Sequence, residues 1–131
     1  MKKLPLLHSE ISGLVASLGH NDMLVVGDAG LPIPAQTKRI DLALTKGVPG
    51  FIETVSTILT EMQVERIILA EETGRVSPQI QAEIERLLPG TPIETVSHDQ
   101  LKELSHSARA VIRTGEFTPY ANIILVSGVV F

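Results

Sequence analysis

The sequence predicts an α/β protein in which a largely parallel sheet carries helices on both faces, a three-layer arrangement with Rossmann-like order. Two observations predict this fold. Segments with apolar residues at helical spacing alternate with short apolar segments typical of buried strands, and the connections between them are mostly short. The chain also has 131 residues, of which 44% are hydrophobic and 20% charged. That size suits one hydrophobic core, so we expect residues 1–131 to form a single domain.

The first quarter of the chain contains a helix pattern followed by two strand patterns. A helix is predicted between Ser9, which suits an N-cap, and Gly19, which is placed to end it. Residues 23–27 form an apolar run typical of a buried strand, and the proline-containing stretch 28–34 is predicted to be a rigid loop. Residues 39–44 alternate polar and apolar side chains. This pattern predicts a strand with one solvent-facing side, either at the edge of the sheet or antiparallel to its neighbours.

The same alternation continues to the end of the sequence. Residues 51–62 have helical spacing, and residues 64–70 form an apolar strand pattern. Ser77 and Pro78 are typical of the start of a helix that extends to residue 88, with the serine as its cap. The remaining predicted elements are strands at 92–96, 110–113 and 122–127 and a short helix at 97–105.

The C-terminal residues are unusually apolar for the end of a chain. No polar side chain follows Ser127, and the sequence ends in two valines and Phe131. Chain termini are normally exposed to solvent. Either this segment folds back onto its own core or it is buried against another subunit. We favour the second alternative, which makes the protein a homo-oligomer.

The composition argues against several classes of protein. There is no cysteine, which excludes disulfides, thiolate nucleophiles and iron–sulfur clusters. The formal net charge of −4, the absence of Trp and the single Tyr argue against a nucleic-acid partner. The apolar runs are too short to span a bilayer, and no signal peptide can be read at the N-terminus. We therefore expect no membrane partner and a cytoplasmic location.

The common cofactor and metal motifs do not occur in the sequence. It contains no G-x-G-x-x-G after a strand, no phosphate-binding P-loop and no G-x-S-x-G hydrolase elbow. The four histidines show neither H-x-H nor H-E-x-x-H spacing. We therefore expect no cofactor and no metal. What remains is acid–base chemistry carried out by the protein's own side chains.

Polar residues follow the predicted strands at positions where α/β proteins bind ligands. In open α/β sheets this is the carboxyl end of the strands. Asp28 and Glu71 with Glu72 directly follow apolar runs, His98 follows the predicted strand at 92–96, and a turn at residues 114–122, which contains Tyr120, lies between the last two strands. Glu71 and Glu72 are weak candidates for a paired-carboxylate site, because adjacent residues on an extended strand point to opposite faces.

Two histidines lie at predicted helix ends with opposite electrostatic character. His20 follows the end of the first helix, where the helix dipole favours a charged imidazolium, and His98 opens a helix, where it favours the neutral ring. The pair could therefore provide a proton donor and a proton acceptor. Each residue also has an ordinary structural interpretation: the histidines cap helices or are solvated, Asp28 caps its loop, and Tyr120 packs. Lys102, one turn after His98, either reaches a ligand hydroxyl or is solvated.

Four long segments of the sequence resemble the D-ribose pyranase family, whose relatives include the fucose mutarotases. They begin with Gly-His-Asn-Asp-Met-Leu-Val-Val-Gly-Asp-Ala-Gly at residues 19–30 and continue with Arg-Ile-Asp-Leu-Ala-Leu-Thr-Lys-Gly-Val-Pro at residues 39–49. The other two are Ala-Val-Ile-Arg-Thr-Gly-Glu at residues 110–116 and Pro-Tyr-Ala-Asn-Ile-Ile-Leu at residues 119–125. The resemblance covers nearly the whole chain and is loosest between residues 73 and 95.

This resemblance implies a homo-oligomeric, cytoplasmic isomerase that interconverts the pyranose and furanose forms of D-ribose without metal or cofactor. It also implies a ring-shaped decamer with its sites between neighbouring subunits. By the same resemblance His20 is the proton donor. The implied substrate-binding residues are Asp28, His98, Tyr120, Ala121 and Asn122. The alternatives are a mutarotase for fucose or another sugar, a non-catalytic sugar-binding protein linked to ribose uptake, and a purely structural oligomer.

Overall fold

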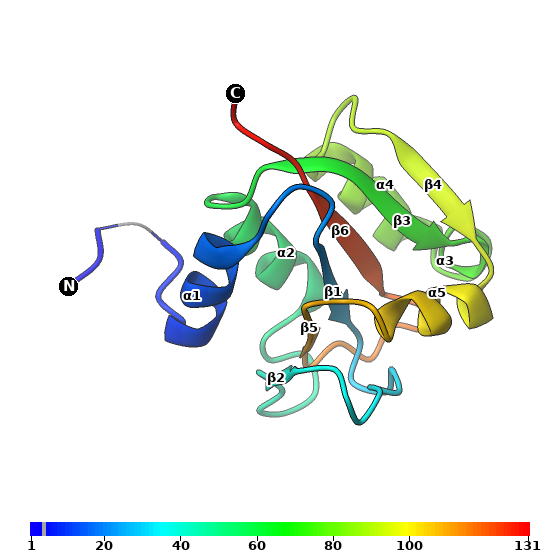
Figure 1. Cartoon of the computed structure of the whole chain (residues 1–131). Coiled ribbons are helices and arrows are strands. Elements are labelled where there is room, and N and C mark those ends of the chain that lie inside the picture. Colours follow the sequence, from blue (N-terminus) through cyan, green and yellow to red (C-terminus); the bar gives the residue numbers. More distant parts are fainter. Residues whose placement is uncertain (4) are drawn as a thin grey trace.

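The computed structural model describes residues 1–3 and 5–131 and contains a six-stranded sheet in the order β2-β5-β1-β6-β3-β4 (Figure 1). Five of these strands run parallel to one another, and β6 runs antiparallel to both of its neighbours, β1 and β3. The strands are β1 (Met23–Gly27), β2 (Arg39–Asp41), β3 (Val64–Ala70), β4 (Ile93–Val96), β5 (Ala110–Arg113) and β6 (Ile123–Ser127).

Helices cover both faces of this sheet, which confirms the predicted fold class. In Figure 1, α5 lies in front of the sheet and α2 and α4 lie behind it. One core joins α1, α2 and α4 to one face of the sheet, and the other core places α5 and the loop after β1 on the opposite face. The helices are α1 (Ser9–Ser17), α2 (Phe51–Leu59), α3 (Glu71–Val76), α4 (Pro78–Leu87) and α5 (His98–Ser105).

The central strand β1 is apolar throughout because both of its faces are covered. Leu24 and Val26 belong to the core shared with α2, whereas Val25 belongs to the core shared with α5. Successive residues of a strand point to opposite faces, so a strand covered on both sides needs an apolar residue at every position. All three side chains are fully buried. The sequence pattern identified this strand with its observed bounds.

Strand β2 is shorter than predicted. It spans Arg39–Asp41 instead of residues 39–44, because the Asp41 carboxylate accepts a hydrogen bond from the Ala43 N–H and turns the chain away from the sheet. The strand lies at the edge, as expected, but it pairs parallel to β5, so the antiparallel alternative is wrong. The antiparallel strand is β6, which lies in the middle of the sheet.

Two predicted helix caps are also different in the structure. Ser9 is the first residue of α1, and the cap is His8, whose Nδ1 accepts a hydrogen bond from the Ile11 N–H at 3.4 Å. Ser77 precedes α4 as predicted, but its hydroxyl does not cap the helix and instead donates to the Pro119 carbonyl at 2.6 Å. Ser97 does cap α5, by accepting from the Gln100 N–H.

Helix α3 is an element that the sequence analysis missed. Glu71 and Glu72 form its first turn, so they do not stand on an extended strand as expected. The helix is only six residues long, contains Gly74 and buries a single residue, Thr73. It therefore has no apolar stripe that sequence periodicity could detect.

The C-terminal segment extends away from its own core. Val130 and Phe131 are 86% and 101% exposed, so the alternative in which the segment folds back is wrong. In Figure 1 the terminus leaves the sheet beyond β6. Within the described residues, no helix is both long enough and apolar enough to cross a membrane.

Candidate active site

Most of the predicted site residues converge at one end of the sheet. Strands β1, β3, β4 and β5 end there, and β6 begins there because it runs in the opposite direction: its first residue, Ile123, pairs with Val26 near the end of β1. Asp28 follows β1 and Asn122 precedes β6, so the two side chains meet although they are 94 positions apart in the sequence. We call this region the carboxyl edge.

Asp28 and Asn122 form a reciprocal pair at the carboxyl edge. The Asn122 Oδ1 accepts from the Asp28 N–H at 2.9 Å, and the Asn122 Nδ2 donates to the Asp28 Oδ2 at 3.1 Å. The other Asp28 oxygen, Oδ1, accepts from the Gly30 N–H at 2.9 Å. Burial raises the pKa of the Asp28 carboxyl, and the bonds from Gly30 and Asn122 counteract part of that increase. The carboxylate is thereby fixed in orientation without a cationic partner among its hydrogen-bond donors.

His98 and Tyr120 are brought together beside this pair. Their ring centroids are 5.0 Å apart and their planes are nearly perpendicular, an edge-to-face contact. The His98 backbone N–H donates to the Glu72 carboxylate at 2.9 Å, which fixes the start of α5 against α3. Within the described residues, the His98 Nδ1 is buried and has no hydrogen-bond partner. A buried polar atom without a partner is costly, so this nitrogen is a natural contact for a ligand.

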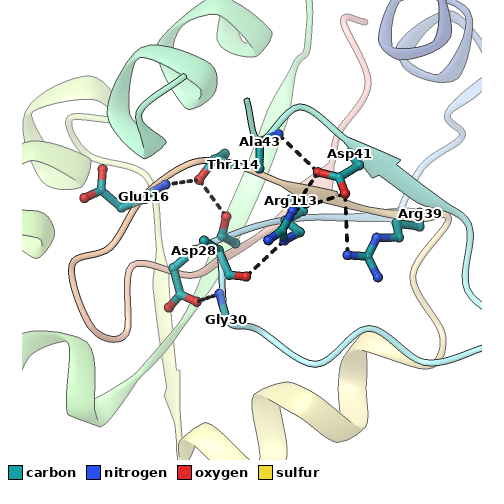
Figure 2. Close-up of polar contacts among 10 residues, drawn as sticks. Asp28, Gly30, Arg39, Asp41, Ala43, Arg113, Thr114 and Glu116 are labelled. Atoms are coloured by element: carbon teal, nitrogen blue, oxygen red, sulfur yellow. Dashed lines mark hydrogen bonds and ion pairs between the residues drawn. The ribbon is translucent and has the colours of Figure 1, made fainter. Parts of the chain in front are cut away.

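The loop that carries Asp28 is held in place by the end of β5 (Figure 2). The Arg113 Nε donates to the Ala29 carbonyl at 3.0 Å, while the same guanidinium binds both carboxylate oxygens of Asp41 at 3.1 and 3.2 Å. The buried Thr114 hydroxyl donates to the Gly27 carbonyl at 2.8 Å. Sequence reasoning did not identify Arg113, and it placed Thr114 only at the start of the turn between the last two strands. The available signal was their position directly at the end of a buried strand.

Glu116 connects the same region to helix α2. Its carboxylate accepts from the Phe51 N–H at 3.1 Å and from the Thr118 hydroxyl at 2.7 Å, and its carbonyl accepts from the Ala29 N–H. Burial acts to raise the pKa of Glu116, but the hydrogen bonds from Thr118 and Phe51 outweigh it and lower the pKa overall. Glu116 therefore caps the first turn of α2 and stiffens the turn that leads to Tyr120.

Two hollows flank this arrangement. A cleft of about 370 Å³ is lined by Asp28, Gly30, Arg113 and residues 116–119. A second hollow of about 470 Å³ lies between residues 32–34 and the exposed side of α5, where Lys102 is paired with Asp99 at 2.8 Å. That ion pair raises the pKa of Lys102. Both hollows are open to solvent and border the carboxyl edge.

The chemical groups at the carboxyl edge suit a ligand rich in hydroxyl groups. A carboxylate, an amide, a phenol and an imidazole together offer both donors and acceptors of hydrogen bonds. Among the described residues, no three His, Asp or Glu side chains are grouped in a way that would hold a metal ion. The arrangement can therefore bind hydroxyls and move protons.

His20 is the predicted site residue that the chain does not bring to the carboxyl edge. It precedes β1, whereas Asp28 follows β1, and the five residues of that strand alone separate the two by roughly 16 Å. The His20 Nε2 lies 2.5 Å from the Glu65 carboxylate, and both side chains are about half exposed. His20 borders a hollow of about 390 Å³ that is also lined by residues 128–131. Sequence reasoning did not identify Glu65, whose strand pattern marks it only as a solvent-facing residue.

Comparison with known proteins decides the family. The model of the RbsD / FucU transport protein family matches residues 1–130. The chain belongs to this family. The D-ribose pyranase of Chloroflexus aggregans is 63% identical and that of Clostridium perfringens 56% identical, each over the full length of both chains. The resemblance found in the sequence motifs is thereby confirmed.

Solved structures of RbsD / FucU relatives have the same fold. Bacillus subtilis RbsD complexed with D-ribose aligns over the whole of both chains with a TM-score of 0.96 and 45% identity. The fucose mutarotase of Streptococcus pneumoniae in complex with L-fucose aligns over the whole of both chains with a TM-score of 0.85 and 26% identity. The family thus includes sugar-bound structures that superpose on the entire chain.

Proposed function

We propose that this chain is an isomerase that interconverts the pyranose and furanose forms of D-ribose without a metal or organic cofactor. The observation that carries the proposal is its full-length similarity, at 52–63% identity, to proteins named D-ribose pyranase. The carboxyl edge supports it, because the fixed Asp28–Asn122 pair and the unpartnered His98 nitrogen suit a small polyhydroxylated ligand.

Ring opening and ring closure each require two proton transfers. To open the ring, a proton is delivered to the ring oxygen and another is removed from the anomeric hydroxyl, while the bond between the anomeric carbon and the ring oxygen breaks. The resulting aldehyde closes through a different hydroxyl, and the transfers run in reverse. We assign the proton donor to His20, because an imidazole can both donate and accept a proton. General acid–base catalysis of this kind contributes about 10²–10⁴-fold to a rate.

The remaining residues would hold the sugar while its ring opens. We assign hydroxyl contacts to Asp28, His98, Tyr120 and Asn122. Ala121 lies between the last two and is fully buried, so its contribution would come from the main chain. Each polar group that is buried without a partner costs about 1–3 kcal/mol, so a sugar site needs a dense set of donors and acceptors. Lys102 borders the second hollow, where it could reach a hydroxyl by leaving Asp99.

We further propose that the complete site forms between subunits of a homodecamer. Within one chain, His20 lies at the opposite end of the sheet from Asp28 and Asn122, so a neighbouring subunit would have to supply it. The fully exposed Phe131 lines the same hollow as His20 and would be buried by that neighbour. We place the protein in the cytoplasm, a reducing compartment that suits a chain without cysteine.

The test is magnetisation transfer by NMR between the anomeric signals of ribopyranose and ribofuranose. It compares wild-type protein, the His20→Ala variant and a sample without protein. We expect faster exchange with the wild-type chain and a return to the uncatalysed rate with His20→Ala, which should still bind ribose. Equal loss of binding and of rate would contradict a proton-donor role for His20.

The second candidate is a mutarotase for fucose, which the similarity to the Streptococcus pneumoniae fucose mutarotase favours. The same experiment with the two anomers of L-fucose separates the candidates, since each reaction gives its own pair of exchanging signals. Binding of ribose without acceleration of either exchange would support a non-catalytic sugar-binding protein linked to ribose uptake. The absence of any sugar binding would leave a structural oligomer.

A further inference from the structure

The buried hydroxyls of Thr73, in helix α3, and of Ser77, the residue that follows this helix, hold the turn that carries Tyr120. The Thr73 Oγ1 donates to the Tyr120 carbonyl at 2.8 Å, and the Ser77 Oγ donates to the Pro119 carbonyl at 2.6 Å. The side chains of Thr73 and Ser77 come from residues that are 0% and 1% exposed. Ser77 directly follows the end of α3 and its N–H donates to the Thr73 carbonyl at 2.9 Å, and the two hydroxyls bind two consecutive carbonyls of the turn.

The main chain at Tyr120 needs such support. Its φ is 60°, in the left-handed region that a bulky side chain rarely adopts. This conformation persists only where the surroundings fix it. The Tyr120 carbonyl also accepts from the Asn122 N–H at 2.9 Å, so the hydroxyl of Thr73 completes the set of bonds that close the turn.

The position of Ser77 shows that its hydroxyl has been diverted from its usual role. Ser77 is the residue before α4, where a serine normally accepts a hydrogen bond from a main-chain N–H of the first turn. It makes no such cap, and its hydroxyl points to Pro119 instead. Helix α4 thus lacks a side-chain cap from Ser77, and the same hydroxyl instead fixes the Pro119 carbonyl of the turn.

This turn sets the direction of two site residues at once. The left-handed conformation at Tyr120 directs its ring against His98 at 5.0 Å and directs the next residues into β6, so that Asn122 reaches Asp28. A change in the Pro119–Tyr120 peptide would therefore move Tyr120 and Asn122 together.

We propose that Thr73 and Ser77 are positioning residues for the ribose reaction: their hydroxyls fix the Pro119–Tyr120 carbonyls so that Tyr120 and Asn122 hold the sugar. This inference rests on the function proposed above. It assigns a role to α3, whose own side chains need not contact the sugar.

The test compares Thr73→Val and Ser77→Ala with two controls. Thr54→Val removes another buried hydroxyl, which donates to the carbonyl of Gly50, the residue before α2, and makes no hydrogen bond to the turn among the described residues. Thr73→Ser restores a hydroxyl at the position under test. Loss of one buried hydrogen bond should weaken ribose binding by about fivefold in Thr73→Val, with recovery in Thr73→Ser and no change in Thr54→Val.

Two further measurements separate positioning from general destabilisation. The pH profile of the exchange rate at saturating ribose should keep the wild-type shape in Thr73→Val, because the proton donor is untouched. The amide NMR signals of Ala121, Asn122 and Asp28 should shift in Thr73→Val and Ser77→Ala but not in Thr54→Val. Equal effects of Thr73→Val and Thr54→Val on binding and on these amides would overturn the inference.

Ribose binding and isomerisation by the wild-type protein distinguish failure of the proposed function from failure of the positioning role of Thr73 and Ser77. If wild-type protein neither binds nor isomerises ribose, the proposed function fails, and the amide signals alone decide whether α3 fixes the turn. If Thr73→Val does not fold, the comparison of Thr73→Ser with Ser77→Ala decides the matter. Normal ribose affinity in a folded Ser77→Ala, together with unshifted amides, would then contradict the inference.

Discussion

The two ends of the sheet are built in different ways. At the carboxyl edge, Asn122 and Thr73 are completely buried, and their polar atoms bond to other parts of the same chain. At the opposite end, the side chains of His20 and Glu65 are about half exposed, and the terminal Phe131 is fully exposed beside them. The candidate proton donor therefore lies at the end that the chain leaves open.

This difference shows which parts of the proposed site a single chain can form. A hydrogen-bonded core fixes Asp28 and Asn122 before any ligand arrives, so the binding half is preorganised. Among the described residues, the side chain of His20 is held by a contact with Glu65 at the protein surface. Under the proposed function, each copy of the chain then offers a finished binding half and a donor that must be inserted into the binding half of another copy.

The largest expected effect comes from an experiment that places an intact His20 and an intact Asn122 on different subunits. His20→Ala is expected to lower the exchange rate by about 10²–10⁴-fold. Asn122→Ala is expected to lower it by at least about tenfold. Subunits of the two variants, mixed and reassembled, should recover about a quarter of the wild-type activity, because random pairing restores that share of the sites. NMR exchange rates before and after mixing provide the measurement. Absence of recovery in confirmed mixed oligomers would show that His20 acts within its own chain or not at all.

Removal of residues 129–131 should have the next largest effect. It should weaken the assembly of subunits at the end of the sheet that carries His20 and leave the carboxyl edge intact. Burial of a valine or phenylalanine side chain contributes about 1.5–3 kcal/mol, so deletion of three apolar side chains should weaken each subunit contact severely. We expect a smaller mass by light scattering and a folded subunit with an unchanged circular dichroism spectrum. An unchanged mass would remove the terminal segment from the interface. Deletion of the fully exposed Met1 is the control for loss of a chain end.

Asn122→Ala should have a moderate effect on stability that His20→Ala lacks. It removes both bonds to Asp28, and the buried carboxylate then loses a donor, which should lower the free energy of unfolding by about 1–3 kcal/mol. Removal of this donor should also raise the pKa of Asp28 further. His20→Ala removes an exposed side chain and should change stability by less than about 0.5 kcal/mol. Denaturant unfolding of both variants tests the contrast, which similar losses in the two would contradict.

The sequence predicted much of this arrangement because simple rules govern the features concerned. Short strand patterns located all six strands, β2 by its alternation of polar and apolar side chains, and the rule that α/β sheets bind ligands at the carboxyl ends of strands pointed to Asp28, His98 and Tyr120. These rules need only local information. Asn122 and Ala121 came from the family resemblance, because nothing local distinguishes a buried asparagine that precedes a strand.

The features that were missed depend on contacts between distant segments. The antiparallel direction of β6 follows from its pairing with β1 and β3, which no local pattern encodes. The role of Thr73 exists only because α3 lies beneath a turn 47 positions later in the chain. Arg113 shows the same limit: its apolar strand was recognised, but its bond to the Ala29 carbonyl required the fold.

The smallest predicted effect concerns the charge on Glu116, which should make the stability of the carboxyl edge depend on pH. The pKa of Glu116 is lower in the folded chain than its ordinary value of about 4.3, because Thr118 and Phe51 donate to the ionised form. A carboxyl group with a lowered pKa stabilises the fold above its unfolded-state pKa, and this contribution is lost as the pH falls through the folded-state pKa. Glu116→Gln should therefore be less stable than the wild-type chain by about 1 kcal/mol at pH 7.

The difference between the two chains should shrink as the pH falls below about 4, since protonated Glu116 resembles glutamine in charge. Thermal unfolding of both chains between pH 7 and pH 3 measures it, with the exposed Glu103→Gln as the control for an ordinary surface carboxylate. A difference that stayed constant down to pH 3 would mean that the shape of the Glu116 side chain, and not its charge, holds the turn. In that case the hydroxyl bonds from α3 would carry a larger share of the support for Tyr120, and Thr73→Val should then affect ribose binding more than Glu116→Gln does.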